Sequence, residues 1–209
     1  MRPVAVVHLD ESCLGNGREG DNPGGGGGLV EARTRGGRIE RRDVFIHAPA
    51  TTNNRMALSG AIATLQLLAR KQARLGVLIV SDSEYLVKGM REWVPGWAAR
   101  GWKRRSGPIE NLELWQALHK SARLHDVQWT WVRGHRGHAK NEYANDLAVK
   151  AAREQVTSEG LVESGFEDWL AGKRKKGLYL TYDPDAAFAA LEARVAADEA
   201  FPLADSLSS

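Results

Sequence analysis

Two short apolar runs, each followed closely by an aspartate, constrain the fold of this chain most strongly. The first run covers residues 4–9 and leads into Asp10, and the second covers residues 77–80 and leads into Asp82. Their β-branched and apolar residues are typical of buried strands. Between the runs, residues 54–75 carry apolar side chains at helical spacing. The order strand, helix, strand indicates an α/β sheet, in which a carboxylate just past a strand end lies where such sheets bind ligands.

A glycine-rich stretch follows the first run and includes five consecutive glycines at positions 24–28. A phosphate-binding loop is one interpretation, but no Lys-Ser/Thr pair follows the glycines and no helix begins after them. The stretch is therefore predicted to be a flexible lead-in. It precedes a predicted hairpin of residues 29–34 and 38–46, joined by a turn that contains two glycines.

The pattern of residues 83–155 predicts three further helices and one further strand. Ser83 is a candidate N-cap for a helix through residues 85–90. The remaining predicted elements are an amphipathic helix over 111–124, a strand over 127–132 and an alanine-rich helix over 139–155.

Residues 91–105 combine three tryptophans with five Lys and Arg residues. Trp93 and Trp97 are four residues apart, so they are expected to pack on the same side of a helix. With Trp102 they are interpreted as structural anchors. The cations beside them, including Lys103 and Arg104, make a patch suited to nucleic-acid phosphates.

Charge changes sign towards the C-terminus. Residues 1–154 contain 24 Lys and Arg against 16 Asp and Glu, whereas residues 155–209 contain five against ten. A basic body favours a polyanionic ligand, and solubility alone is the simpler explanation. We predict one domain over 1–154 and an acidic, partly helical extension over 155–209. The sequence leaves open whether that extension packs on the domain, binds a partner or is partly disordered.

Cysteine content and hydropathy bear on the compartment. Cys13 is the only cysteine, so an internal disulfide is impossible. No apolar run reaches the roughly 18 residues of a membrane helix, and the N-terminus lacks the features of a secretory signal. We expect a cytoplasmic protein that does not enter a membrane.

Four motifs occur in order: Leu9-Asp10-Glu11-Ser12-Cys13, Thr52-Asn53-Asn54-Arg55-Met56, Ser81-Asp82-Ser83, and Gly134-His135-Arg136-Gly137-His138 with Asn141-Glu142 after it. Over about residues 4–154 the chain resembles the type 1 ribonuclease H family. The resemblance implies an α/β ribonuclease H fold, with a mixed five-stranded sheet and helices on both faces. It also implies endonucleolytic, Mg²⁺-dependent hydrolysis of the RNA strand of RNA·DNA hybrids, leaving a 5′-phosphate, by a protein expected to be a monomer.

The family holds two Mg²⁺ ions, which Mn²⁺ can replace, with carboxylates at four positions. Asp10 and Asp82 match two of them, whereas Ala57 stands where a glutamate is expected and Asn145 where an aspartate is expected. The resemblance thus implies Asp10, Asp82 and the amide oxygen of Asn145 as metal ligands. His135 matches the histidine that assists proton transfer or product release.

Three nearby carboxylates are candidates to compensate for the missing charges. Glu11 adjoins Asp10, but alternate strand residues point to opposite faces, so Glu11 is expected to face away. Asp146 is turned by about 100° from Asn145 around the helix. Glu142 shares a face with Asn145, but the family keeps a glutamate there as well as the aspartate. None is a convincing substitute, so weak or absent cleavage is predicted.

The gap at Ala57 has two interpretations, a deliberate inactivation or a natural divergence. The first is favoured because the motif around Ala57 is intact. At Asn145 natural variation is favoured, because Tyr143 and Ala144 also depart from the usual family pattern.

The resemblance implies that one group of residues reads the 2′-OH groups of the hybrid: Cys13, Asn16, Thr52, Asn53 and Asn54. Glu84 stands where the family has a glutamine, which puts its minor-groove hydrogen bond in question. The tryptophans and cations of the basic patch are candidate backbone contacts. A hybrid-binding protein without nuclease activity is the alternative function, and an interaction module acting through the extension is a third.

Overall fold

The computed structural model describes residues 2–15, 22–70, 72–104, 106–134 and 137–201. Its mixed sheet has six strands in the order β5-β4-β1-β2-β3-β6. The strands are β1 (Val4–Cys13), β2 (Gly24–Arg33), β3 (Ile39–Ala48), β4 (Gly76–Ser81), β5 (Asp126–Trp131) and β6 (Val162–Glu163). β1 pairs parallel with β4 and antiparallel with β2. The predicted five strands are present, and the two-residue β6, from the extension, adds a sixth.

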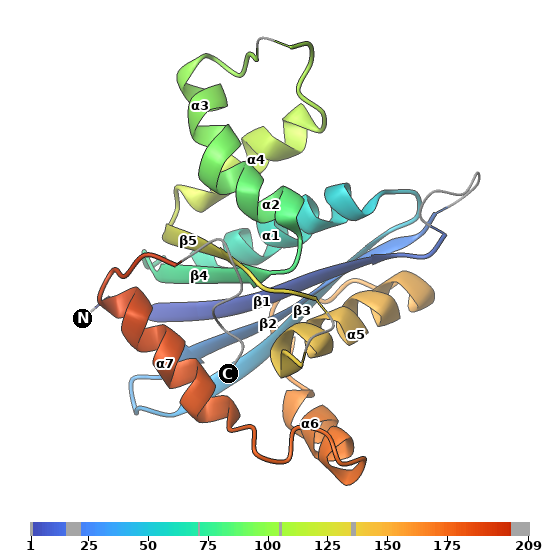
Figure 1. Cartoon of the computed structure of the whole chain (residues 1–209), viewed down its shortest axis with the longest axis vertical. Coiled ribbons are helices and arrows are strands. Elements are labelled where there is room, and N and C mark those ends of the chain that lie inside the picture. The colour runs from blue at the N-terminus through green and yellow to red at the C-terminus, as the bar shows by residue number, and fades with distance from the viewer. Residues whose placement is uncertain (1, 16–21, 71, 105, 135–136, 202–209) are drawn as a thin grey trace.

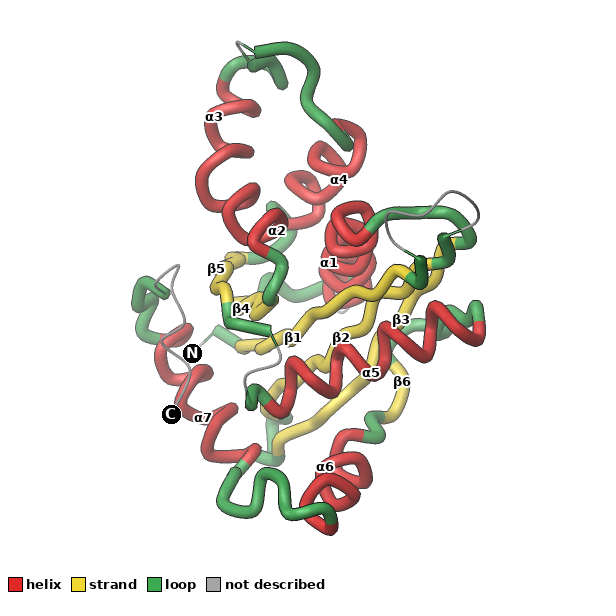
Figure 2. The backbone as a smooth tube through the Cα atoms, turned by 45° about the vertical axis from the view of Figure 1, so that its right-hand side comes forward, coloured by secondary structure: helices red, strands yellow, loops and turns green. Residues whose placement is uncertain are grey.

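Helices cover both faces of this sheet (Figures 1 and 2). They are α1 (Asn53–Ala69), α2 (Glu84–Lys88), the π-helix η1 (Gly89–Trp93), α3 (Val94–Ala99), α4 (Leu112–Ala122), α5 (Ala139–Glu154), α6 (Phe166–Lys175) and α7 (Pro184–Ala196). Helix α1 ends at Ala69, earlier than the predicted end at Leu75. Among the described residues, none of the helices combines the length and the apolar character needed to cross a membrane.

Helix α1 packs on its face of the sheet through interlocking apolar side chains. Leu58, Leu65 and Leu68 of the helix belong to one buried cluster with Val7 and Ile79 of the strands. Strand residues of one parity face this helix, as the alternation of side chains along a strand requires. The apolar spacing of the sequence is therefore sufficient to explain this layer.

The glycine run is a strand, and its prediction as a flexible lead-in was wrong. Gly24–Gly28 begin β2 and are paired with both β1 and β3. A methyl group at Gly27 would lie 2.2 Å from the carbonyl oxygen of Ala144, and one at Gly25 would lie 2.0 Å from that of Ala148. Glycine is needed there because the backbone of α5 lies directly against the strand.

The extension folds back onto the same face of the sheet as α5. Phe188, Leu191 and Val195 of α7 are buried with Val6 of β1 and Leu78 of β4. Helix α6 contributes the buried Phe166 and Leu170, which pack near Tyr143 of α5. The sequence left three possibilities open for the extension. Its described part packs on the domain.

Residues 84–122 form a helical protrusion beyond the sheet, made of α2, η1, α3 and α4 (Figure 1). Ser83 caps the start of α2, and its side-chain oxygen accepts a hydrogen bond from the Leu86 amide at 3.4 Å. This confirms the predicted cap. Because the protrusion begins two residues after Asp82, its position is tied to the carboxyl end of β4.

Candidate active site

Three carboxylates meet where β1 and β4 separate. The parallel pairing of these strands ends at Leu9 and Ser81. Asp10 and Glu11 follow on β1, and Asp82 follows β4 directly. One oxygen from each of the three carboxylates lies within 4.8 Å of the others. The prediction that Asp10 and Asp82 share one edge of the sheet agrees with this geometry.

Glu11 joins this group, so the prediction that it faces away was wrong. Strand alternation itself holds. Asp10 lies on the α5 face, where Asn141 contacts it. Glu11 is paired with Gly26, which faces Met56 and Gly60 of α1. The two faces are not separated here, however, because β4 has already ended beside them. A carboxylate on the α1 face therefore reaches the site past the end of β4, where it lies near Ser83.

The site concentrates negative charge with little solvent around it. Asp10 is only 7% exposed. Burial, and then repulsion from Asp82, raises the pKa of Asp10 to about 8. Burial, followed by repulsion from Asp10 and Asp82, also raises the pKa of Glu11 well above its usual value. Clustered carboxylates are stabilised by cations, and oxygen donors of this kind suit Mg²⁺ or Mn²⁺.

Neighbouring groups orient Asp10 and Asp82. Asn141 of α5 donates from Nδ2 to Oδ2 of Asp10 at 2.8 Å, and the Glu11 amide donates to Oδ1 at 2.7 Å. Oδ1 of Asn141 is buried and has no hydrogen-bond partner among the described residues. A methyl group at Gly134 would lie 2.2 Å from Oδ2 of Asp82, so a side chain at this position would force the Asp82 carboxylate to move.

The two positions that lack an expected carboxylate lie on α1 and α5. Ala57 is buried in the apolar cluster beneath α1. Asn145 is half-buried one helical turn after Asn141 and so lies on the same side of α5. Asp146 is not part of the carboxylate cluster, and its Oδ2 accepts a hydrogen bond from Nε1 of Trp169 at 2.7 Å.

The first group of predicted substrate-binding residues gathers around the start of β2. Cys13 and the side chain of Thr51 both lie against Gly24. Thr52 caps α1, with its oxygen accepting from the Arg55 amide at 3.3 Å. Asn53 and Asn54 begin the helix, and Oδ1 of Asn53 is buried with no hydrogen-bond partner among the described residues. Two predicted residues, Asn16 and His135, lie outside the part of the chain that the structure describes.

The second predicted group lies in the helical protrusion. Trp93 and Trp97 pack together, with ring centroids 5.9 Å apart, as their spacing predicted. Arg104 joins both of them in lining a cavity of about 410 Å³. Three other residues of this group have separate placements: Trp102 packs on His119, Lys103 is exposed, and Glu84 forms an ion pair with Lys88 at 2.5 Å.

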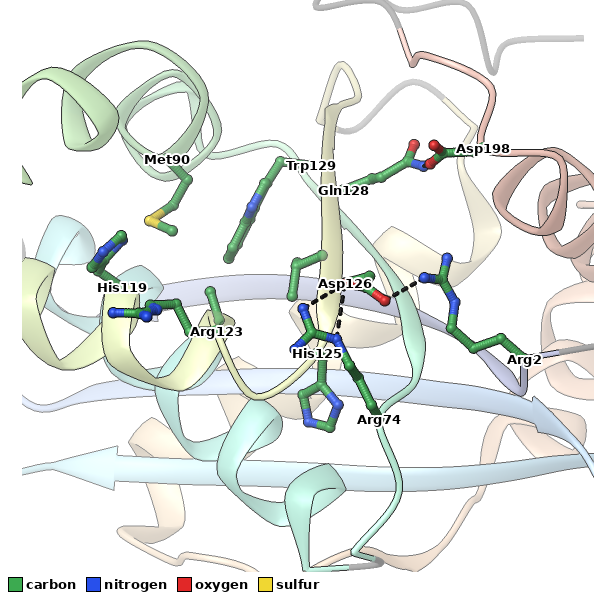
Figure 3. Close-up of a pocket in the computed structure, with 12 residues that line it drawn as sticks. Arg2, Arg74, Met90, His119, Arg123, His125, Asp126, Gln128, Trp129 and Asp198 are labelled. Atoms are coloured by element: carbon green, nitrogen blue, oxygen red, sulfur yellow. Dashed lines mark hydrogen bonds and ion pairs between the residues drawn. The ribbon is translucent and has the colours of Figure 1, made fainter.

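A larger cavity, of about 560 Å³, lies near the opposite end of β4 and β5. Figure 3 shows Arg2 and Arg74 converging on Asp126 at the start of β5. Asp10, Glu11 and Asp82 do not line this cavity. Arg2 and Arg74 are engaged by Asp126, which holds the strand ends together, so the carboxylate cluster is the candidate site for the chemistry.

Sequence reasoning missed two residues of the site, Glu11 and Asn141. For Glu11 the available signal was the adjacent pair Asp10-Glu11 at the end of a predicted strand. It was set aside because alternate strand residues point to opposite faces. For Asn141 the signal was its place one turn before Asn145 on the same predicted helix.

Comparison with known proteins agrees with this architecture. The RNase H family profile matches residues 2–153. A ribonuclease H of Pelobacter propionicus is 44% identical over 149 residues, which cover 71% of this chain and 84% of the relative. A ribonuclease H of Aromatoleum aromaticum is 42% identical over 159 residues, or 74% of this chain and 96% of the relative.

A solved structure supports the same assignment. The crystal structure of LC9-RNase H1, described as a type 1 RNase H with the type 2 active-site motif, has a TM-score of 0.76 and 56% sequence identity. The match covers 82% of each chain. Fold, motifs and relatives agree, and the chain belongs to the type 1 ribonuclease H family.

Proposed function

We propose that this chain hydrolyses the RNA strand of RNA·DNA hybrids endonucleolytically, with divalent cations held by Asp10, Glu11 and Asp82. The observation that carries the proposal is the meeting of these three carboxylates at the end of β1 and β4. Glu11 enters from the face that α1 covers, so it supplies the charge that the family pattern places at Ala57. The resemblance to a type 1 RNase H described as having the type 2 active-site motif supports variation in the active-site motif within this family.

The donor set suits Mg²⁺, with Mn²⁺ as a substitute. The amide oxygen of Asn145 is a further ligand in this proposal, on the same side of α5 as Asn141. When bound, the cations activate a water molecule and stabilise the charge that develops on the leaving oxygen. His135 is proposed, from the resemblance alone, to assist proton transfer.

The chain's own residues orient these groups and grip the hybrid. Asn141 keeps Asp10 aligned through its hydrogen bond, and Ser83 lies near Glu11. The Asn53–Asn54 region is proposed to recognise 2′-OH groups, and the cations and tryptophans of the protrusion to contact the backbone. Residues 1–154 are proposed to form the catalytic domain.

The test is cleavage of a labelled RNA·DNA hybrid in Mg²⁺ and in Mn²⁺ by wild type, Glu11→Gln and Ala57→Glu. We expect wild type to cut and Glu11→Gln to lose at least about 100-fold in kcat, at the upper end of effects seen for residues that only support metal ligands. Glu154→Gln, exposed at the end of α5, is the matched control and should cut normally.

Two outcomes would contradict the proposal. If wild type binds hybrid and cuts in neither metal, the protein is a hybrid-binding protein. If only Ala57→Glu restores strong cleavage, Glu11 does not replace the missing glutamate.

A further inference from the structure

The extension contacts helix α5 repeatedly along its first two turns. Nζ of Lys140 donates to the Pro184 carbonyl at 2.9 Å. Glu142 lies near the hydroxyl of Tyr179 and, after burial, contributes to raising its pKa, and Asp146 accepts a hydrogen bond from the indole of Trp169 at 2.7 Å. These contacts alternate along the helix with Asn141 and Asn145, which face the site. The extension thus holds one side of α5 while the other side holds the carboxylate cluster.

A buried ion cluster anchors this arrangement to the sheet. Glu31 of β2 is fully buried. Its carboxylate lies 2.9 Å from Nε of Arg41 and 2.7 Å from Nζ of Lys140. Arg41 also pairs with Glu167 and Asp185, each at 2.6 Å, at the starts of α6 and α7. A buried carboxylate requires such partners, so the beginnings of three helices are tied to one point on the sheet.

The interface between α5 and the sheet explains why additional anchors matter. Gly25 and Gly27 present no side chains to α5, and the backbone of Ala144 and Ala148 on the helix lies directly against them. Helices keep their position on a neighbour by fitting side-chain ridges into grooves. At Gly25 and Gly27 the close approach leaves no side chains to interlock with α5, so its position there depends on polar contacts elsewhere along the helix.

We propose that the C-terminal extension is a positioning element of the active site. Through its contacts with Lys140, Glu142 and Asp146 it fixes the axial position of α5, and thereby the positions of Asn141 against Asp10 and of Asn145. The inference rests on the proposed function, in which these groups hold divalent cations. Its consequence is that weakening the contacts lowers metal affinity and kcat while leaving the KM for hybrid unchanged.

The experiment uses the full chain with the double substitution Trp169→Phe and Tyr179→Phe. It removes the indole hydrogen bond to Asp146 and the hydroxyl near Glu142, and it keeps aromatic rings at both positions. Glu192→Gln is the matched control, because it weakens an exposed ion pair between α7 and Arg33 of β2 that does not involve α5. Mn²⁺ binding is measured by calorimetry without substrate, and amide hydrogen exchange is followed along α5.

We expect the double variant to raise the Mn²⁺ dissociation constant by about three- to tenfold, below the roughly 10–100-fold typical of direct partners of metal ligands. Exchange of the amides of residues 141–146 should accelerate, kcat should fall and KM should stay the same. The control should match wild type in all four measurements. Should the double variant fail to fold, Trp169→Phe alone provides the same comparison, because it removes the hydrogen bond to Asp146.

Wild-type affinity for Mn²⁺ and unchanged α5 exchange in a folded variant would overturn the proposal and leave the extension as a cover for the sheet. A wild-type protein that cuts no hybrid would instead contradict the proposed function. The calorimetric and exchange results would still decide the positioning role, so the two failures are distinguishable.

Discussion

Helices α1 and α5 cover opposite faces of the same sheet, and they are held there in different ways. Helix α1 packs through leucines that interlock with Val7 and Ile79 of the strands. Helix α5 lies backbone to backbone against the glycines of β2, and polar contacts from the extension hold its outer side. The apolar interface of α1 can therefore tolerate repacking, whereas the glycine interface of α5 depends on the space between two backbones.

The largest expected effect comes from adding one methyl group to the glycine interface. Gly27→Ala places a carbon 2.2 Å from the Ala144 carbonyl oxygen, so α5 must move. We expect a loss of about 3 kcal/mol in unfolding free energy. Because a shift of about 1 Å can cost roughly 100-fold in rate, kcat/KM should fall by a similar factor. Denaturant unfolding and hybrid cleavage measure both quantities.

The neighbouring glycine provides the control for that substitution. A methyl group at Gly26 points to the α1 face, where its nearest neighbour is Cγ1 of Ile46 at 3.3 Å. Gly26→Ala requires only a small shift of the Ile46 side chain, so its losses should be much smaller than those of Gly27→Ala in both measurements. Equal losses in the two variants would show that the strand, rather than the contact with α5, requires glycine.

A cavity on the α1 face should separate stability from activity. Leu65 is fully buried, so Leu65→Ala is expected to lower the unfolding free energy by about 2–5 kcal/mol. Cleavage by the folded protein should stay within about threefold of wild type. A threefold change in rate corresponds to about 0.7 kcal/mol in activation free energy. A loss of activity as large as that of Gly27→Ala would break the distinction between the two faces.

A last expected effect is a pH dependence of stability without metal. Burial and Asp82 raise the pKa of Asp10 to about 8, so the unfolded chain, in which Asp10 titrates near its usual value, binds fewer protons between these pKa values. The contribution of Asp10 to the unfolding free energy is fully present below the pKa of Asp10 in the unfolded chain. It is lost as pH rises through the pKa of Asp10 in the folded protein. Asp10→Asn should therefore be progressively more stable than wild type as pH rises towards 8.

Thermal unfolding in chelator at several pH values measures this difference. Burial lowers the pKa of His8, which adds its own pH dependence to both proteins. Comparing wild type with Asp10→Asn reduces that shared contribution. An Asp10→Asn protein whose stability follows wild type at every pH would contradict the raised pKa.

Much of the architecture was predictable because it depends on local pattern. Apolar runs identified β1 and β4, helical spacing identified α1, and the Ser83 cap was recognised from a single side chain. The motifs around Asp10 and Asp82 also located the site at the end of these strands. Such features depend on residues close together in the chain, so the sequence by itself determined them.

Other features were decided only by the tertiary structure. Whether five glycines form a loop or a strand depends on α5, more than 100 residues away, and on how closely its backbone approaches. Whether Glu11 reaches Asp10 depends on where β4 ends. Alternation along β1 sets the direction of the Cβ atom of Glu11. It does not set the position of the carboxylate once the neighbouring strand β4 has ended. The extension became a layer on the sheet because Phe188 and the buried Glu31 find partners in segments far apart in the sequence. In each case the physical cause is a contact between distant segments, which no local pattern contains.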